Sequence, residues 1–465
     1  MTQPHPATPA TRPGRDVVPF GQAVRAWFAI SLQTFGGPAG QIAVMQRELV
    51  EERRWIGPQR LLHALNYCML LPGPEAQQLA VYIGWLLNGL RGGLVAGVLF
   101  VLPGVVALLA LSAIYVAWGE ATAVTAIFAG LAPAVVAVVA QAVLRVGGRA
   151  LGHPALVAVA VGAFAALAVF GVPFPAVVAA AAAVGWLLGR LAPYTMTGQG
   201  RKGGHDAGGP PPLIPDHALH TEPPNLARAA RILGLGLLVW AIPVAAAALF
   251  TGTGSTLTTQ GLFFSGTALV TFGGAYAVLA YVAQQAVATY GWLSPTEMVR
   301  GLALAETTPG PLIMVVQFVA FLGAYHHPDP LTPWTAALLG ALLTTWVTFV
   351  PCFLFIFLGA PYVEQLRGNH SLSAALTGIT AAVVGVIANL ALYFAVHTLF
   401  ATSHSLHWGP LKLEVPELSS LRPVSLVITV AAVVMIFRLR WSVPRTLAVC
   451  AGLGLAASLA GLNVV

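Results

Sequence analysis

The stretch Thr34-Phe35-Gly36-Gly37 recurs as Thr271-Phe272-Gly273-Gly274, 237 residues further along the chain. At the same interval, Pro72-Gly73-Pro74 recurs as Pro309-Gly310-Pro311. Both motifs interrupt helices, because glycine costs about 1 kcal/mol relative to alanine and proline lacks the amide N–H. One interval shared by two separate motifs indicates a unit that occurs twice, with two helix breaks in each copy.

The composition predicts an all-α polytopic membrane protein. Only 8% of the residues are charged and 57% are hydrophobic, with a mean hydropathy of +0.81, whereas soluble proteins carry about 25% charged residues. Apolar runs that approach the length of a membrane-spanning helix occur at 93–117, 121–144, 154–171, 174–190, 229–250, 334–360, 372–400, 421–437 and 446–463. The net charge of +7 fits loops that face an anionic leaflet, and we expect no nucleic-acid partner.

A polar segment rich in glycine and proline divides the chain into two halves. We predict a polar N-terminal tail over 1–21, a first repeat over 22–195, a flexible cytoplasmic linker over 196–225 and a second repeat over 226–465. Later in the repeats the interval rises to 248, as in Pro103 and Pro351. We expect most of the extra residues of the second half to form a loop at 325–330.

The distribution of arginine predicts that the two repeats are inverted. Arg47, Arg53, Arg54 and Arg60 follow the first Gly-Gly motif, whereas the equivalent stretch after the second holds only Arg300. Lysine and arginine concentrate on the cytoplasmic side, so we expect the linker inside and the C-terminus outside. The segments that carry the motifs, 22–45, 61–90, 260–283 and 300–323, then form broken or re-entrant helical hairpins, beside about nine full crossings, or about 12 or 13 if the broken segments also span.

The breaks predict a site for an oxyanion. Within a membrane, an interrupted backbone survives only where it contacts protein or a wet cavity. The N-terminus of a broken helix presents N–H groups with a partial positive charge, which bind anions, and threonine and glutamine side chains beside the breaks can add donors. The residues that we expect to bind substrate are Thr34, Phe35, Gly36, Gly37, Pro72, Gly73, Pro74, Gln77, Gln78, Thr271, Phe272, Gly273, Gly274, Thr308, Pro309, Gly310, Pro311 and Gln317.

Two acidic residues beside the breaks are candidates for proton coupling. Glu75 directly follows Pro72-Gly73-Pro74, and Glu306 lies three residues before Pro309. A carboxylate inside a membrane is costly and is by default a functional candidate, although Glu75 could instead stabilise a helix N-terminus. The two acids do not occupy equivalent repeat positions, so the site is pseudo-symmetric at best.

The motif residues resemble the chromate ion transporter family in its long, two-domain form. The resemblance lies in 35–41 (FGGPAGQ), 55, 71–80 (LPGPEAQQLA), 82–85 and 92–93, and in 272–276 and 308–311 of the second half. It covers both halves outside the linker and the termini. It implies a carrier in the bacterial inner membrane that exports chromate with the proton-motive force and thereby confers resistance, with sulfate as a structural mimic.

We therefore expect a secondary transporter rather than an enzyme, without cofactor or bound metal. Its partners are chromate or sulfate, protons and the lipid bilayer, and a homodimer is left open. Two alternatives stand beside this reading. One is a sulfate carrier or an anion channel without proton coupling. The other is a membrane enzyme acting on phosphorylated lipid, which the sequence disfavours because it lacks the acidic pairs that hold Mg²⁺.

Overall fold

The fold is described from a computed structural model, which places residues 16–35, 37–119, 121–192, 212–215, 225–272, 274–360, 370–408 and 411–462. Most of the expected tail and linker lies outside the described residues. So do two of the glycines predicted to bind substrate, Gly36 and Gly273.

The first half consists of helices, with one short π-helical turn after α2. They are α1 (Phe20–Gln33), α2 (Gly37–Gln46), η1 (Arg47–Glu52), α3 (Pro58–Cys68), α4 (Glu75–Trp118), α5 (Thr122–Ala150), α6 (Pro154–Ala168) and α7 (Phe174–Leu191). The length of α4 includes a kink, because Asn88 and Gly89 leave helical geometry.

The second half repeats this order after one additional helix, α8 (Leu226–Thr251). Its elements are α9 (Thr256–Val270), α10 (Ala275–Gln284), η3 (Gln285–Thr289), α11 (Pro295–Thr307), η4 (Leu312–Met314), α12 (Val315–His326), α13 (Pro333–Gly359), α15 (His370–Leu399), β1 (Ser403–Trp408), β2 (Leu411–Pro416), η6 (Leu418–Ser420), α16 (Pro423–Val433), η7 (Val434–Arg438) and α17 (Val443–Leu459).

Helix starts follow the intervals seen in the sequence. α3 and α11 begin 237 residues apart, and α5 and α15 begin 248 apart. α7 and α17 begin 269 apart, an interval that the sequence did not suggest. The first increase coincides with the connection between α12 and α13 at 327–332, which overlaps the loop expected at 325–330; residues 325 and 326 still belong to α12. The second coincides with an antiparallel hairpin, β1–β2, inserted between α15 and α16.

The expected all-α membrane fold is confirmed, with that hairpin as an addition. Within the part of the chain that the structure describes, six helices are long and apolar enough to cross a membrane, namely α4, α5, α7, α8, α13 and α15. Shorter apolar helices account for the remaining runs. α8 buries none of its residues against the described protein, which suits a helix whose surface faces lipid.

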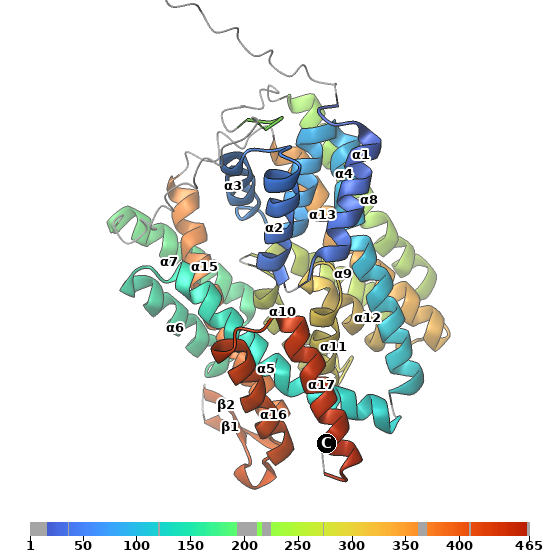
Figure 1. The fold of residues 1–465 in the computed structure, drawn as a ribbon, viewed down its shortest axis with the longest axis vertical. Coiled ribbons are helices and arrows are strands. Elements are labelled where there is room, and N and C mark those ends of the chain that lie inside the picture. The colour runs from blue at the N-terminus through green and yellow to red at the C-terminus, as the bar shows by residue number, and fades with distance from the viewer. Residues whose placement is uncertain are drawn as a thin grey trace, which may run out of the picture.

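Each of the four motif segments is interrupted as expected. Non-helical residues separate α1 from α2, α3 from α4, α9 from α10, and α11 from η4 and α12. In Figure 1 the blue α1, α2 and α3 occupy the upper part of the molecule, and α10 and α11 lie below them, toward the end where the C-terminus is marked.

The later helices of the two repeats interlock through glycine. Gly130 of α5 packs on Gly454 of α17, where an added Cβ would lie 3.0 Å from the partner Cα. Gly185 of α7 packs on Gly378 of α15, with a corresponding distance of 2.8 Å. Gly378 and Gly454 are the repeat equivalents of Gly130 and Gly185, so the two contacts are exchanged copies of one another. Such close approach suits helix packing in lipid.

Candidate oxyanion site at the four helix breaks

Hydrogen bonds between the two repeats join the four breaks in pairs. The Gly73 amide donates to the Thr271 carbonyl over 2.7 Å, and the Gly310 amide donates to the Thr34 carbonyl over 2.9 Å. Thr271 and Gly310 are the repeat equivalents of Thr34 and Gly73. Each repeat therefore supplies one carbonyl from its first break and one amide from its second break to the other repeat.

The long helices enclose the second break of the opposite repeat. A Cβ added at Gly73 would lie 2.8 Å from Cys352 Sγ of α13, and one added at Gly310 would lie 3.3 Å from the Gly104 Cα of α4. Gly104 and Cys352 are again repeat equivalents. Gly73 and Gly310 have φ of +124° and +105°, which favours glycine. Gly73 and Gly310 are thus favoured both by backbone geometry and by close packing.

The threonine hydroxyls at the breaks bond to their own helices. Thr34 Oγ1 donates to the Ser31 carbonyl over 2.8 Å, and Thr271 Oγ1 donates to the Thr267 carbonyl over 2.7 Å. Both threonines are fully buried. Their hydroxyl hydrogens are engaged in this conformation, so these side chains end α1 and α9 rather than offer free donors.

The glutamines differ in how far they are engaged. Gln78 Nε2 donates to the Pro72 carbonyl over 2.7 Å, and Gln317 Nε2 donates to the Val105 carbonyl over 3.0 Å. Gln77 is fully buried and neither its Nε2 nor its Oε1 has a hydrogen-bond partner among the described residues. A buried amide without partners costs about 1–3 kcal/mol per group. Gln77 is therefore the predicted site glutamine whose amide is wholly unengaged by the described residues, whereas Gln78 and Gln317 each use one of two N–H donors.

One further glutamine belongs to this cluster. Gln41 of α2 is buried, and its Nε2 donates to the Gly310 carbonyl over 2.5 Å. It ties the first repeat to the second break of the other repeat. The sequence places Gln41 in the family-like motif, but nothing local to it shows this partner, and we did not expect it in the site.

The helices that follow the breaks begin without side-chain caps. Neither Pro74 at the start of α4, nor Gly274 at the start of α10, nor Pro311 at the start of η4 provides a side-chain hydrogen bond to the first turn. Uncapped N–H groups and the helix dipole make such ends suited to anions.

The two acidic candidates have different surroundings. Glu306 is buried, and its Oε1 accepts a hydrogen bond of 2.5 Å from Tyr276 Oη at the start of α10. Glu75 is half-buried at the first position of α4, and no described residue hydrogen-bonds to its carboxyl. The structure therefore places one carboxyl in a protein contact and the other at a helix start.

The remaining predicted residues lie around this cluster. Thr308 is buried, and its hydroxyl donates to the Ala305 carbonyl over 3.0 Å. Gly37 is buried at the start of α2, and Phe272 is partly buried. Phe35 is exposed and does not contribute to the enclosed cluster.

A family model described as "Chromate transporter" matches residues 21–186 and 259–456. The chain belongs to the chromate transporter family. The two matched regions include all four breaks, and α8 lies between them.

Curated relatives agree with the family match. A chromate transport protein of Pseudomonas aeruginosa is 32% identical over 395 residues, which cover 83% of each chain. A chromate transport protein of Cupriavidus metallidurans is 27% identical over 80% of this chain and 82% of the relative. An uncharacterized transporter of Methanocaldococcus jannaschii is 22% identical over 80% and 83%. No solved structure matches the chain. This chromate transporter family member is thus a multi-pass membrane protein whose relatives are named as transporters.

Proposed function

We propose that this protein exports chromate across the bacterial inner membrane, driven by the proton-motive force, and so confers resistance to chromate. The observation that carries the proposal is the pair of bonds between the breaks, from the Gly73 amide to the Thr271 carbonyl and from the Gly310 amide to the Thr34 carbonyl. Both bonds link the two repeats. Movement of one repeat's break segments relative to those of the other repeat would therefore disrupt or form both hydrogen bonds together.

This geometry supports an alternating-access mechanism. In the described conformation the two glycine amides are occupied by carbonyls, and the surrounding space is filled by protein. When the hairpins move, the Gly73 and Gly310 amides lose these carbonyl partners and become donors to a tetrahedral dianion. The uncapped helix starts and the Gln77 amide complete its coordination. Because these donors are neutral, the anion is held without an ion pair that would slow its release.

Protons enter through Glu306 and Glu75. A carboxylate beside the anion repels it, and protonation removes that repulsion, which couples proton uptake to anion movement. Tyr276 fixes the orientation of the Glu306 carboxyl by its hydrogen bond. The lack of an equivalent acid in each repeat means that only the anion cradle is shared between the repeats.

Inverted topology is part of the proposal. The cross-repeat bonds and the glycine contacts between α5 and α17 and between α7 and α15 are exchanged copies, as expected for a pseudo-two-fold axis. The placement of α2 and α3 above α10 and α11 supports an axis in the membrane plane (Figure 1), with the linker in the cytoplasm.

A labelling experiment tests the inversion. Glu52 and Thr289 are exposed and occupy equivalent repeat positions. Single cysteines introduced by Glu52→Cys and Thr289→Cys should react with an impermeant maleimide from opposite sides of the membrane. Equal labelling of both from one side would rule out inversion.

Flux into inside-out vesicles tests the transport function. Chromate should accumulate when a pH gradient is imposed, and both Glu306→Gln and Glu75→Gln should weaken the dependence on that gradient. Glu51→Gln, at an exposed carboxylate, is the matched control and should retain it. Unsaturable flux that follows only the electrochemical gradient would instead identify a channel, and accumulation of sulfate but not chromate would identify a sulfate carrier.

A further inference from the structure

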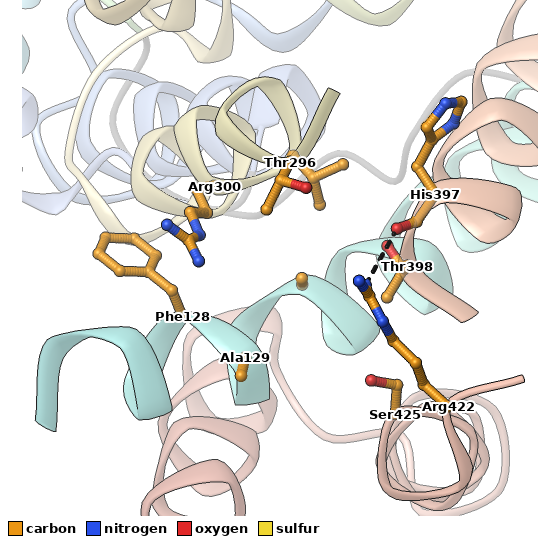
Figure 2. A pocket seen from close by; sticks show the side chains of 10 residues that line it. Phe128, Ala129, Thr296, Arg300, His397, Thr398, Arg422 and Ser425 are labelled. Atoms are coloured by element: carbon orange, nitrogen blue, oxygen red, sulfur yellow. Dashed lines mark hydrogen bonds between the residues drawn. The ribbon is translucent and has the colours of Figure 1, made fainter. Parts of the chain in front are cut away.

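A half-open pocket lies between α5, α11, α15 and the start of α16, away from the four breaks (Figure 2). It is lined by Phe128, Ala129, Ala132, Thr296, Val299, Arg300, His397, Thr398, Arg422 and Ser425. None of these is a break residue. α11 connects the two places, since Arg300 precedes Glu306 by six positions, a rise of roughly 9 Å along the helix axis.

Two arginines bring positive charge into this pocket from different elements. Figure 2 shows the guanidinium of Arg300 entering from α11 and that of Arg422 entering from the start of α16. Arg300 Nη1 donates to Tyr115 Oη over 3.0 Å, and Arg422 Nη1 donates to the His397 carbonyl over 3.5 Å. A guanidinium carries five N–H donors, so most donors of both groups remain available.

No carboxylate among the described residues forms an ion pair with either arginine. The acids on the adjoining elements have other partners. Glu297 of α11 accepts from the Ser294 amide over 2.8 Å, and Glu414 of β2 pairs with His397 Nε2 at 3.1 Å. Neither guanidinium is therefore in contact with a carboxylate of the described protein.

An unpartnered hydroxyl completes the lining. Thr398 is only 4% exposed, and its Oγ1 has no hydrogen-bond partner among the described residues. A buried hydroxyl without a partner costs about 1–3 kcal/mol. The pocket thus combines two guanidiniums that have no carboxylate partner among the described residues with a hydroxyl that lacks a hydrogen-bond partner there, a donor set that fits an oxyanion.

We propose that this pocket binds a divalent tetrahedral oxyanion of the sulfate and chromate class between Arg300 and Arg422, as a second site distinct from the four breaks. Arg422 precedes α16, and Figure 1 shows α16, β1, β2 and the marked C-terminus toward the lower end of the molecule. The proposal that the pocket binds an oxyanion depends only on the side chains of Arg300, Arg422 and Thr398. Its role as an outer vestibule, from which an exported anion leaves, rests on the proposed transport function.

Protection of an introduced thiol tests the site at equilibrium, without transport. Ala129 is a half-buried lining residue, and the native cysteines are buried. In nanodiscs of zwitterionic lipid, sulfate should slow the reaction of the Ala129→Cys variant with a small charged thiol reagent. Added Arg422→Gln or Arg300→Gln should raise the sulfate concentration for half-protection about tenfold or more, and Arg422→Lys should raise it less.

Two controls make the result specific. Arg445→Gln removes an arginine that stacks on Trp441, outside the pocket, and should leave protection unchanged. A Leu418→Cys variant, at an exposed position beside the hairpin, should react at a rate independent of sulfate.

Three outcomes would overturn the site. The first is that sulfate gives no protection, and the second is that protection survives both Arg300→Gln and Arg422→Gln. The third is protection by anionic lipid in the nanodisc but not by sulfate, which would assign the pocket to a lipid headgroup. The transport proposal fails separately, since sulfate protection without chromate flux would retain the site and refute the transporter.

Discussion

Gly73→Ala is expected to destabilise the fold more than Gly274→Ala, although both glycines have positive φ. Their φ angles are +124° and +100°, and an L-residue held in such a conformation costs about 1–3 kcal/mol. The two sites differ in their neighbours. An added Cβ at Gly274 meets nothing within 4 Å, whereas at Gly73 it would lie 2.8 Å from Cys352 Sγ and 2.9 Å from Gln78 Nε2.

The overlap sets the difference between the two variants. Overpacking in a closed site costs about 1–3 kcal/mol, so we expect a loss of stability of about 2–6 kcal/mol for Gly73→Ala and about 1–3 kcal/mol for Gly274→Ala. The overlap involves a side chain of α13 in the other repeat. Cys352→Ala removes that sulfur atom, and in the double variant it should recover part of the loss.

Thermal unfolding of the detergent-solubilised protein, followed by the amount of monodisperse protein after heating, ranks these variants. The expected order of midpoints is wild type, then Gly274→Ala, then Gly73→Ala, with the Gly73→Ala/Cys352→Ala double variant above the value expected from adding the two single effects. Equal midpoints for Gly73→Ala and Gly274→Ala, or strict additivity with Cys352→Ala, would refute the packing of the second break against α13.

Three further predictions concern side chains outside that contact. Gln41→Leu removes the bond to the buried Gly310 carbonyl and should lower stability by about 1–3 kcal/mol, which the same unfolding measurement detects. Tyr276→Phe removes the hydroxyl that donates to Glu306; the chain should fold, while the pH dependence of chromate flux in vesicles should shift. The histidine partner of Glu414, with the Ser403 hydroxyl, holds the pKa of that carboxyl below its ordinary 4.5. The hairpin should therefore lose stability as the pH falls below 4.5 through the lowered pKa, and hydrogen exchange of its amides measures this.

Each of these predictions has a matched control. Gln46→Leu, at an exposed glutamine of α2, should leave the unfolding midpoint at the wild-type value. A loss equal to that of Gln41→Leu would show that the Gln41 effect does not come from its bond to the Gly310 carbonyl. Tyr290→Phe, at an exposed tyrosine, should not move the pH profile, and an unmoved profile in Tyr276→Phe would exclude that hydroxyl from coupling. Glu414→Gln should reduce the acid sensitivity of hairpin exchange, while Glu417, whose pKa is also lowered by its bonds to Ser419 and Thr402, retains the remainder; an undiminished acid effect in this variant would contradict the assignment.

The breaks could be predicted from sequence because glycine and proline act locally. The interval of 237 residues located both copies, and the helices begin at Pro58 and Pro295 as that interval requires. The partners of the breaks could not be predicted. The hydrogen bond from the Gly310 amide to the Thr34 carbonyl and the one from Gln41 Nε2 to the Gly310 carbonyl have no signal in the local sequence, because both depend on how the repeats pack.

The inserted hairpin and the arginine pocket were missed for a similar reason. β1 and β2 are stabilised by pairing with each other, and short strands of mixed polarity carry a weak signal in a chain that is apolar elsewhere. Arg300 was counted in the sequence only as evidence for topology. Arg300 and Arg422 are more than 100 residues apart in the sequence, and they line the same pocket only because the helices pack together.

The packing also indicates which part of the molecule can move. α5 packs on α17 and α7 on α15, so the two repeats are interlocked and cannot separate as whole bodies.

The hydrophobic cores divide differently. α1, α3 and the first part of α4 share one core with the end of α13, whereas α10, α11 and α12 share a core with α5, α15 and α17. Movement of the first-repeat hairpins against the remainder therefore disturbs the least packing. It would still break the bonds from Gly73 to Thr271 and from Gly310 to Thr34, which both cross that boundary. In the proposed mechanism, one hairpin group would therefore move against an interlocked scaffold, rather than two equivalent repeats rocking about a common axis.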